Sequence, residues 1–405
     1  MIFGEAFYFV ALAIAVVLFR FAPGRFKPWL IFISGLAFYA YYAGRFWPLI
    51  LAESLLVYVL GQVMLRGRRI GLSAFAIALA GTIGALAYFK YWHLLGPILG
   101  GALGAKSGAL PTFQDIAVPL AISFFTFEFI HYIVDIRRGT IERHGIGQFL
   151  SFAMFAPTMV AGPIKRFQQF TPQVETARAG ADDVSAGATR ILFGLGKKIV
   201  LADTLTLWLG PLSSRGALDQ ASRFQIASAL VAYSLRIYFD FSGYSDIAIG
   251  SARLFGIRVP ENFAWPYLRT SIRSFWRHWH MSLTRWVMDY VYIPLGGNRR
   301  GLPLTCVNLM AAFLVVGLWH GAAWHFVAWG AFQGTLMAGH RLWTELGRKP
   351  LLAALPGLVS GALGKLLHYA GAAAGGLFTF ALVTIGWGLF VMPCDRFLHM
   401  LGRLF

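Results

Sequence analysis

The chain has 405 residues, of which 58% are hydrophobic and only 13% are charged. Soluble globular domains carry about a quarter of charged residues, so this composition excludes a soluble protein and predicts an all-α polytopic integral membrane protein. Lys and Arg number 35 against 17 Asp and Glu, a net charge of +18. These basic residues form short clusters between apolar runs, which is typical of topology signals and lipid contacts rather than of a nucleic-acid-binding surface.

Four apolar segments that we expect to cross the membrane occupy residues 1–92: Ile2–Phe21, Trp29–Ala43, Trp47–Met64 and Ile70–Tyr91. The first has no basic residues before it and no small-residue cleavage site, so we expect a retained span. Basic residues follow the first and third segments more densely than the second. The positive-inside rule therefore places the N-terminus outside.

A Gly-rich connection with Gly96, Gly100 and Gly108 leads to a predicted fifth span, Ile116–Val134. This span contains Glu128 and His131, three residues apart on one helical face. Such a pair could relay protons or make a structural hydrogen bond within the bundle. We favour the structural bond.

The next apolar run, Phe155–Phe170, contains Pro157, Gly162 and Pro163, which predict a bent or re-entrant segment. Lys165 and Arg166 follow these residues, and we expect them to contact an anionic donor at the inner face. The other basic residues available to this donor are Lys197, Lys198, Arg299 and Arg300.

Two polar clusters follow. Gly187–Gly210 carries Lys197 and Lys198 in its middle and cannot cross as a simple lipid-facing helix. After a possible span at Ile226–Phe239, Asp240 and Asp246 flank Ser and Gly residues. This pattern fits a cation site or a tight turn with Asp caps, and we favour the turn.

Arg, Trp and His residues are concentrated between Ile272 and His320, and ionisable groups at membrane depth point to a functional site. A helix over Trp276–Tyr290 would place His280 on the aromatic face and leave His278 solvated. His320 ends the apolar run Pro303–Trp319.

Gly317 and Gly321 flank His320 and would let another backbone or a thin acyl chain come close. His320 is therefore a candidate proton acceptor. Either histidine alone could be a structural imidazole bonded to a carbonyl. The two together favour chemistry.

Beyond His320, the sequence predicts a span at Ala322–Met337, a basic linker at Arg341–Pro350, a Gly/Ala-rich stretch at Leu351–Gly376 and a final span at Leu377–Met392. In all we expect ten to twelve membrane segments, some re-entrant, in a single domain, 1–405. Its parts would be the peripheral spans 1–92, a catalytic core 116–342 and C-terminal helices 351–405. Cys306 and Cys394 lie far apart without metal-ligand spacing, so we expect no disulfide and no metal. We also expect no bound cofactor.

Several motifs resemble those of the membrane-bound O-acyltransferases, in particular the bacterial branch similar to alginate O-acetylation proteins. They are PLAISFFTFEFIHYIVDIRRG (119–139), FAPTMVAGPIKRF (155–167), FDFSGYSDIAIG (239–250), PENFAWPY (260–267), FWRHWHMSLTRWVMDYVYIPLGGNR (275–299) and GLWHG (317–321). By this resemblance His320 is the catalytic histidine and His280 a second, supporting one. Residues expected to contact substrate are Trp276, Trp279, Trp319, Lys165, Arg166 and Asn298.

The resemblance also implies a ring of helices around a thin hydrophobic floor, with a funnel from each side. An acyl group, most simply acetyl from cytoplasmic acetyl-CoA, would cross a bacterial inner membrane to an exported polysaccharide, another envelope polymer or an acyl-carrying partner protein. His320 would act as general base, and His280 would orient it or stabilise the oxyanion. D-alanyl or other acyl transfer to teichoic acid or peptidoglycan is the alternative within this class. A proton-coupled transporter or lipid scramblase is the alternative from another class.

Overall fold

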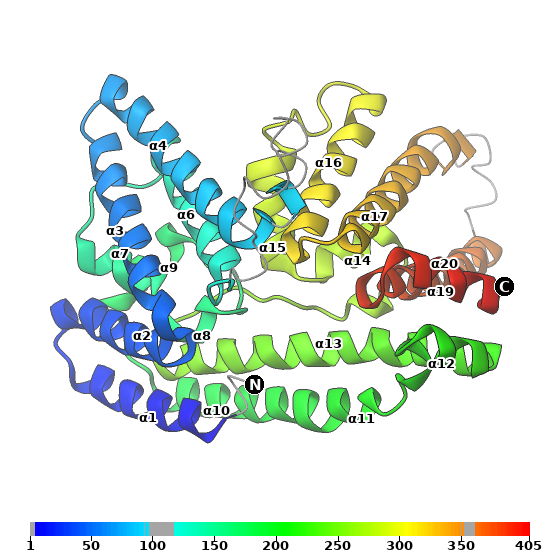
Figure 1. Ribbon diagram of the computed structural model, residues 1–405, viewed down its shortest axis with the longest axis horizontal. Helices are drawn as coiled ribbons and strands as arrows, with labels where there is room; N and C mark the ends of the chain where they lie inside the picture. Colours follow the sequence, from blue (N-terminus) through cyan, green and yellow to red (C-terminus); the bar gives the residue numbers. More distant parts are fainter. Residues whose placement is uncertain (1–4, 93, 97–116, 349, 352–360) are drawn as a thin grey trace. The chain divides into compact units, whose positions relative to one another are not determined.

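The computed structural model describes residues 5–92, 94–96, 117–348, 350–351 and 361–405 (Figure 1). Throughout these ranges the regular structure is helical and contains no strand. The predicted all-helical membrane class is therefore confirmed. Gly100, Gly108, the start of the predicted fifth span and positions 352–360 of the Gly/Ala-rich stretch lie outside the described residues.

The chain divides into two compact units, Met1–Lys197 with Ser242–Glu261, and Lys198–Phe241 with Asn262–Phe405. The first unit contains α1 (Ala6–Phe21), α2 (Lys27–Ala43), α3 (Trp47–Met64), α4 (Arg68–Leu86), α6 (Ile122–Arg137), α7 (Ile146–Ala153), α8 (Ala156–Met159), α9 (Phe167–Val174) and α10 (Ala181–Leu195). The second contains α11 (Asp203–Thr206), α12 (Arg215–Gln220), α14 (Ile272–His278), α15 (Met281–Val287), α16 (Leu302–His320), α17 (Trp324–Leu342), α19 (Gly361–Val391) and α20 (Cys394–Leu404). Helix α13 (Arg223–Leu254) contributes a part to each.

Four helical stretches in the described part of the chain are long and apolar enough to cross a membrane. They are Gly24–Met64, which includes α2 and α3, then Ile70–Tyr91, Leu302–His320 and Gly364–Val391. Helix α1 is apolar but shorter. These stretches coincide with most of the strongest apolar runs of the sequence, because length and hydropathy alone select them.

In the first unit, small residues allow α10 to lie directly against α13. A Cβ atom on Gly194 would stand 2.6 Å from the carbonyl oxygen of Gly243, and one on Gly187 would stand 2.8 Å from that of Gly250. Only glycine permits such an approach of two helix backbones.

The predicted turn around Asp240 and Asp246 is wrong, because α13 continues without interruption from Arg223 to Leu254. Gly243, which suggested the turn, serves helix packing instead. The carboxylates are ion-pair partners and not caps: Asp246 accepts from Lys197 at 2.6 Å, and Asp240 pairs with Lys198.

Two further boundaries can be compared with prediction. The interruption within Phe155–Phe170 is present, since α8 ends at Met159 and α9 begins at Phe167. The predicted linker from Arg341 is instead helical up to Arg348, because α17 reaches Leu342 and a π-helical segment, Trp343–Arg348, continues it. The composition of that segment is polar, but nothing in it stops a helix before Pro350.

In the second unit, α16 and α17 form an antiparallel hairpin, and α19 packs on α17 (Figure 1). A Cβ atom on Gly317 would lie 2.4 Å from the carbonyl oxygen of Phe326 and 3.1 Å from Cα of Gly330. Of the two uses suggested for Gly317, the structure therefore supports the close approach of another backbone. This contact holds the end of α16, where His320 lies.

Candidate active site

His280 occupies a break between α14 and α15, so the predicted single helix over Trp276–Tyr290 is wrong. Ser271 caps α14 by accepting the N–H of Ser274 at 3.2 Å, and the helix ends at His278. His280 itself has φ 42° and ψ 55°, a left-handed conformation that costs a non-glycine residue about 1–3 kcal/mol. A helical wheel cannot reveal such a residue, because it assumes regular backbone angles throughout.

The break nevertheless buries His280, as the wheel predicted. Its side chain is 2% exposed, and its ring contacts Phe241 with centroids 4.7 Å apart. Nδ1 lies 3.1 Å from Oδ1 of Asn262, whereas Nε2 is buried with no hydrogen-bond partner among the described residues. His280 lies outside the four apolar stretches that are long enough to cross a membrane. Burial lowers the pKa of its imidazole to about 3, so the ring is neutral at physiological pH.

His278, by contrast, is partly exposed, and its Nδ1 bonds to the carbonyl oxygen of Ser274 one turn earlier in α14, at 2.7 Å. This is a local helix contact.

His320 is the last residue of α16 and has aromatic neighbours from three elements. Its ring centroid lies 4.6 Å from that of Trp319, 5.2 Å from that of Trp329 on α17 and 4.8 Å from that of Phe390 on α19. His320 is only partly buried, and its apolar neighbours strengthen electrostatic interactions between its ring and any bound substrate.

Trp319 brings the two histidines into one neighbourhood. Its indole contacts His280 with ring centroids 5.9 Å apart, and it also contacts His320. The two histidines, 40 positions apart in the sequence, thus share one aromatic neighbour.

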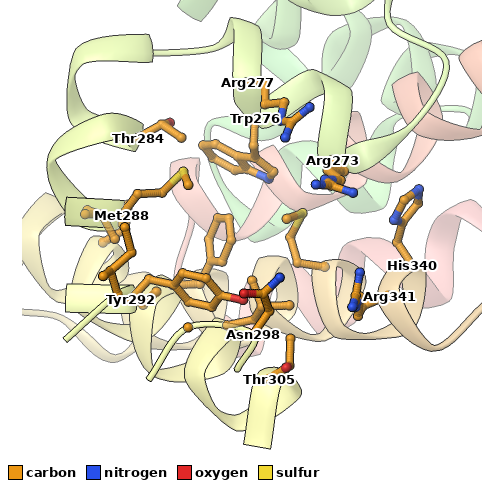
Figure 2. A pocket seen from close by; sticks show the side chains of 18 of the residues that line it. Arg273, Trp276, Arg277, Thr284, Met288, Tyr292, Asn298, Thr305, His340 and Arg341 are labelled. Atoms are coloured by element: carbon orange, nitrogen blue, oxygen red, sulfur yellow. The ribbon is translucent and has the colours of Figure 1, made fainter. Parts of the chain in front are cut away.

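A cavity of about 370 Å³ lies within the second unit (Figure 2). Its basic lining comes from α14, the connection before α16, and the end of α17, and consists of Arg273, Arg277, Arg299, His340 and Arg341. In the view of Figure 2, Arg273, His340 and Arg341 stand on the right, and Met288 and Tyr292 on the left. The combination of arginines with apolar walls suits a ligand that has both an anionic and an apolar part.

One face of α16 forms an apolar wall of this cavity. Leu309, Ala312, Phe313 and Val316 line it at helical spacing. His320 follows Val316 by four residues and therefore continues the same face, about 6 Å farther along the helix. Trp276, which also lines the cavity, contacts Trp329, and Trp329 contacts His320.

The residues expected to contact substrate occupy different places. Trp276 and Asn298 line the cavity. Trp319 lies against both histidines. Trp279 is buried in an aromatic cluster, 5.1 Å from Phe263 and 5.0 Å from Trp387 between ring centroids.

Lys165 and Arg166 belong to the first unit. Lys165 is 1% exposed and donates to Glu128 Oε1 at 2.5 Å, with its ammonium over the ring of Phe152. Glu128 thus makes a buried structural bond, but with Lys165 and not with His131, whose Nε2 accepts from the main-chain N–H of Phe167 at 3.3 Å. Arg166 is the N-cap residue of α9.

Sequence reasoning missed four of the five basic residues of the cavity, namely Arg273, Arg277, His340 and Arg341, and it missed Asn262. One signal was available, since Arg273 and Arg277 are four apart on α14 and so share a face. The position of Asn262 depends on a contact across 18 residues, for which the sequence offers no local signal.

Comparison with known proteins identifies the family of this chain. The sequence model of the membrane-bound O-acyltransferase family matches residues 102–355. The Azotobacter vinelandii protein named "Probable alginate O-acetylase AlgI" is 34% identical over 392 residues, covering 95% of this chain and 74% of the relative. The peptidoglycan O-acetyltransferase of Helicobacter pylori is 32% identical over 359 residues, 80% of this chain and 66% of the relative.

A third relative, the teichoic acid D-alanyltransferase of Streptococcus thermophilus, is 30% identical over 247 residues, 57% of this chain and 58% of the relative. All three relatives are named as transferases of acyl groups, which decides between the enzyme and the transporter interpretations of the sequence. The chain therefore belongs to the membrane-bound O-acyltransferase family and is an O-acyltransferase.

Proposed function

We propose that this enzyme transfers an acetyl group from cytoplasmic acetyl-CoA to a hydroxyl of an exported polysaccharide or another envelope polymer, with His320 as the general base. The relatives that cover most of the chain are named for O-acetylation of alginate or peptidoglycan, which supports an acetyl group and a polymer acceptor.

The observation that carries the proposal is the position of His320 one turn beyond the cavity, on the same face of α16 as Val316. A donor whose anionic part is held by Arg273 and Arg277 would extend its thioester along this wall toward the imidazole. The volume of about 370 Å³ is at the small end of ligand pockets, which suits the narrow arm of a CoA thioester better than the whole donor.

The reaction follows from this arrangement. An imidazole nitrogen of His320 takes the proton of the acceptor hydroxyl as its oxygen attacks the thioester carbonyl. The new C–O bond forms, the C–S bond breaks, and the proton passes to the leaving thiolate. If the acetyl group first moves to an acyl-carrying partner protein, the same base serves that partner's nucleophile.

This proposal assigns the cavity, and not Lys165, to the donor. Lys165 has Glu128 as its buried partner, whereas Arg273 and Arg277 line an open volume beside apolar walls. Arg299, which was among the basic residues expected at the donor side, also lines the cavity.

The cellular setting is part of the proposal. We place the enzyme in a bacterial inner membrane, with its N-terminus in the periplasm. It would have ten to twelve membrane segments, some of them re-entrant, arranged around a thin floor. This arrangement would let a cytoplasmic donor meet an exported acceptor. The distribution of basic residues supports the orientation.

D-alanyl transfer to teichoic acid is the second candidate, favoured by the similarity to a teichoic acid D-alanyltransferase over 57% of the chain. The alginate-type relative matches 95% of the chain, and we therefore place acetyl transfer first.

The test uses purified enzyme in lipid nanodiscs with acetyl-CoA labelled in its acetyl group. Alginate, peptidoglycan fragments and teichoic acid are offered in parallel, and alkali-labile label in the polymer is counted. The proposal predicts label that needs the enzyme, and D-alanyl donors should give none. Transfer from a D-alanyl donor without any from acetyl-CoA would replace the first candidate by the second.

A further inference from the structure

We propose that Asn262 is a positioning residue that holds His280 in one tautomer, with the proton on Nδ1 and a bare lone pair on Nε2. His280 then offers the reaction site a hydrogen-bond acceptor and cannot donate to an oxyanion. Its role in acyl transfer rests on the proposed function; the tautomer itself does not.

The main-chain N–H of Ser282 can only donate a hydrogen bond. This group lies 3.3 Å from the side-chain atom of Asn262 that also faces His280, so that atom is the carbonyl oxygen Oδ1 and not the amide nitrogen. The hydroxyl of Ser282 donates to the same oxygen at 2.7 Å. Nδ1 of His280, 3.1 Å from Oδ1, can therefore bond to it only by carrying the proton.

Asn262 is held in place by its own backbone. It is 0% exposed, and its carbonyl oxygen accepts the N–H of Met281 at 2.9 Å. The loop is tied a second time, since Ala264 donates its N–H to the carbonyl oxygen of His278 at 3.1 Å. The loop containing Asn262 is thus hydrogen-bonded to the main chain on both sides of His280.

Nε2 is the atom left for function. Because the neutral imidazole carries one proton, Nε2 has none, and it is buried without a hydrogen-bond partner among the described residues. Leaving a buried acceptor unsatisfied costs about 1–3 kcal/mol, and the left-handed backbone of His280 adds strain. Phe241 and Trp319 both contact the ring of His280, and Trp319 also contacts His320.

This geometry selects between the two supporting roles that the sequence left open for His280. A bare Nε2 accepts a hydrogen bond and so orients a donor at the site, such as a substrate N–H or O–H or the imidazolium of His320. Stabilising an oxyanion requires a proton on Nε2, and the neutral imidazole has none there while its one proton is on Nδ1, bonded to Asn262.

The test reads the tautomer directly, by ¹⁵N NMR of enzyme labelled at its histidines and reconstituted in lipid. The chain has 10 histidines, and comparison with His280→Gln identifies the signals of His280. The proposal predicts a protonated Nδ1 and an unprotonated Nε2 in the substrate-free enzyme. Ser282→Ala, which keeps the bond between Asn262 and His280, should leave these signals unchanged. A protonated Nε2 in the wild type would overturn the proposal.

Activity provides the second readout. Asn262→Leu should release the tautomer and lower kcat by roughly 100-fold, the scale of a general acid–base contribution. Asn262→Asp, whose carboxylate accepts the same donors, should keep the tautomer and at least about a tenth of the activity. Equal activity in Asn262→Leu and the wild type would overturn the positioning role. If Asn262→Leu does not fold, the wild-type spectrum and Asn262→Asp still decide. Absence of acetyl transfer in wild-type enzyme would instead overturn the proposed function and leave the spectrum to decide the tautomer.

Discussion

The ring of His280 lies 5.9 Å from the indole of Trp319, measured between centroids. Trp319 in turn precedes and contacts His320, so a residue from a strained loop and the last residue of α16 share one aromatic neighbour. The two histidines therefore lie close to the same indole, although they belong to different elements and not to one face of a single helix. This shared contact also separates them from His278, whose ring bonds within its own helix.

The two neighbouring histidines should respond very differently to substitution. We expect His280→Ala to lose about 100-fold or more in acyl transfer, because it removes the buried acceptor Nε2. His278→Ala should keep most activity, since it removes only a local contact to Ser274. The measurement is acyl transfer per unit of folded protein in membranes. Equal losses in the two variants would contradict the assignment.

Lys165 and Glu128 should behave as a structural pair. Lys165→Met leaves the Glu128 carboxylate buried without its cation, and we expect a loss of about 3–5 kcal/mol in the free energy of unfolding. Lys165→Met combined with Glu128→Leu should recover most of this loss, because it removes both charges. Denaturant unfolding in detergent measures both variants. A stable Lys165→Met variant with weakened donor binding would contradict the structural role and show that Lys165 contributes to donor binding.

The arginines of the cavity should govern donor affinity. Arg273→Gln and Arg277→Gln each remove a cation that lines the volume, so we expect KM for the donor to rise several-fold, with a smaller change in kcat and a weaker dependence on salt. Arg285→Gln is the matched control, an exposed arginine on α15 that does not line the cavity. A donor titration at two ionic strengths separates the cases. The same KM in all three variants would show that the donor does not bind in this cavity.

Gly317 should tolerate no side chain, because a Cβ atom there meets the backbone of Phe326 and Gly330. Gly317→Ala should therefore lower the free energy of unfolding by about 1–3 kcal/mol and reduce activity by displacing His320. Gly339→Ala, on α17, is the matched control, since nothing lies within 4 Å of its added Cβ. Thermal unfolding of the two purified variants makes the comparison, and a larger loss at Gly339 would contradict the packing described for α16 and α17.

Hydropathy and residue type predicted what depends on local chemistry. The apolar helices, the interrupted segment near Pro163 and the burial of His280 among aromatic residues are properties of short stretches. Contacts between distant residues were not accessible in this way. In the sequence Gly243 indicates a turn, but in the structure it allows α10 to pack against α13. Lys165 likewise indicates a donor contact, but its partner is Glu128, 37 residues earlier in the chain.

The break at His280 shows the same limit for the active site. Its left-handed backbone is held by the loop of Asn262, and propensities assign no such angle to a histidine. The wheel found the right buried residue because Trp276 and Trp279 flank it in sequence, although the helix that it assumed ends at His278.

The proposed acyl transfer depends on His320 as its base. The most direct measurement is the ester content of envelope polymers in a deletion strain complemented with His320→Ala, normalised to the amount of the protein in the membrane. We expect normal abundance of the variant, with the ester content reduced to that of the deletion strain, because the substitution removes the proposed base at the end of α16. Wild-type ester content at normal abundance would contradict it.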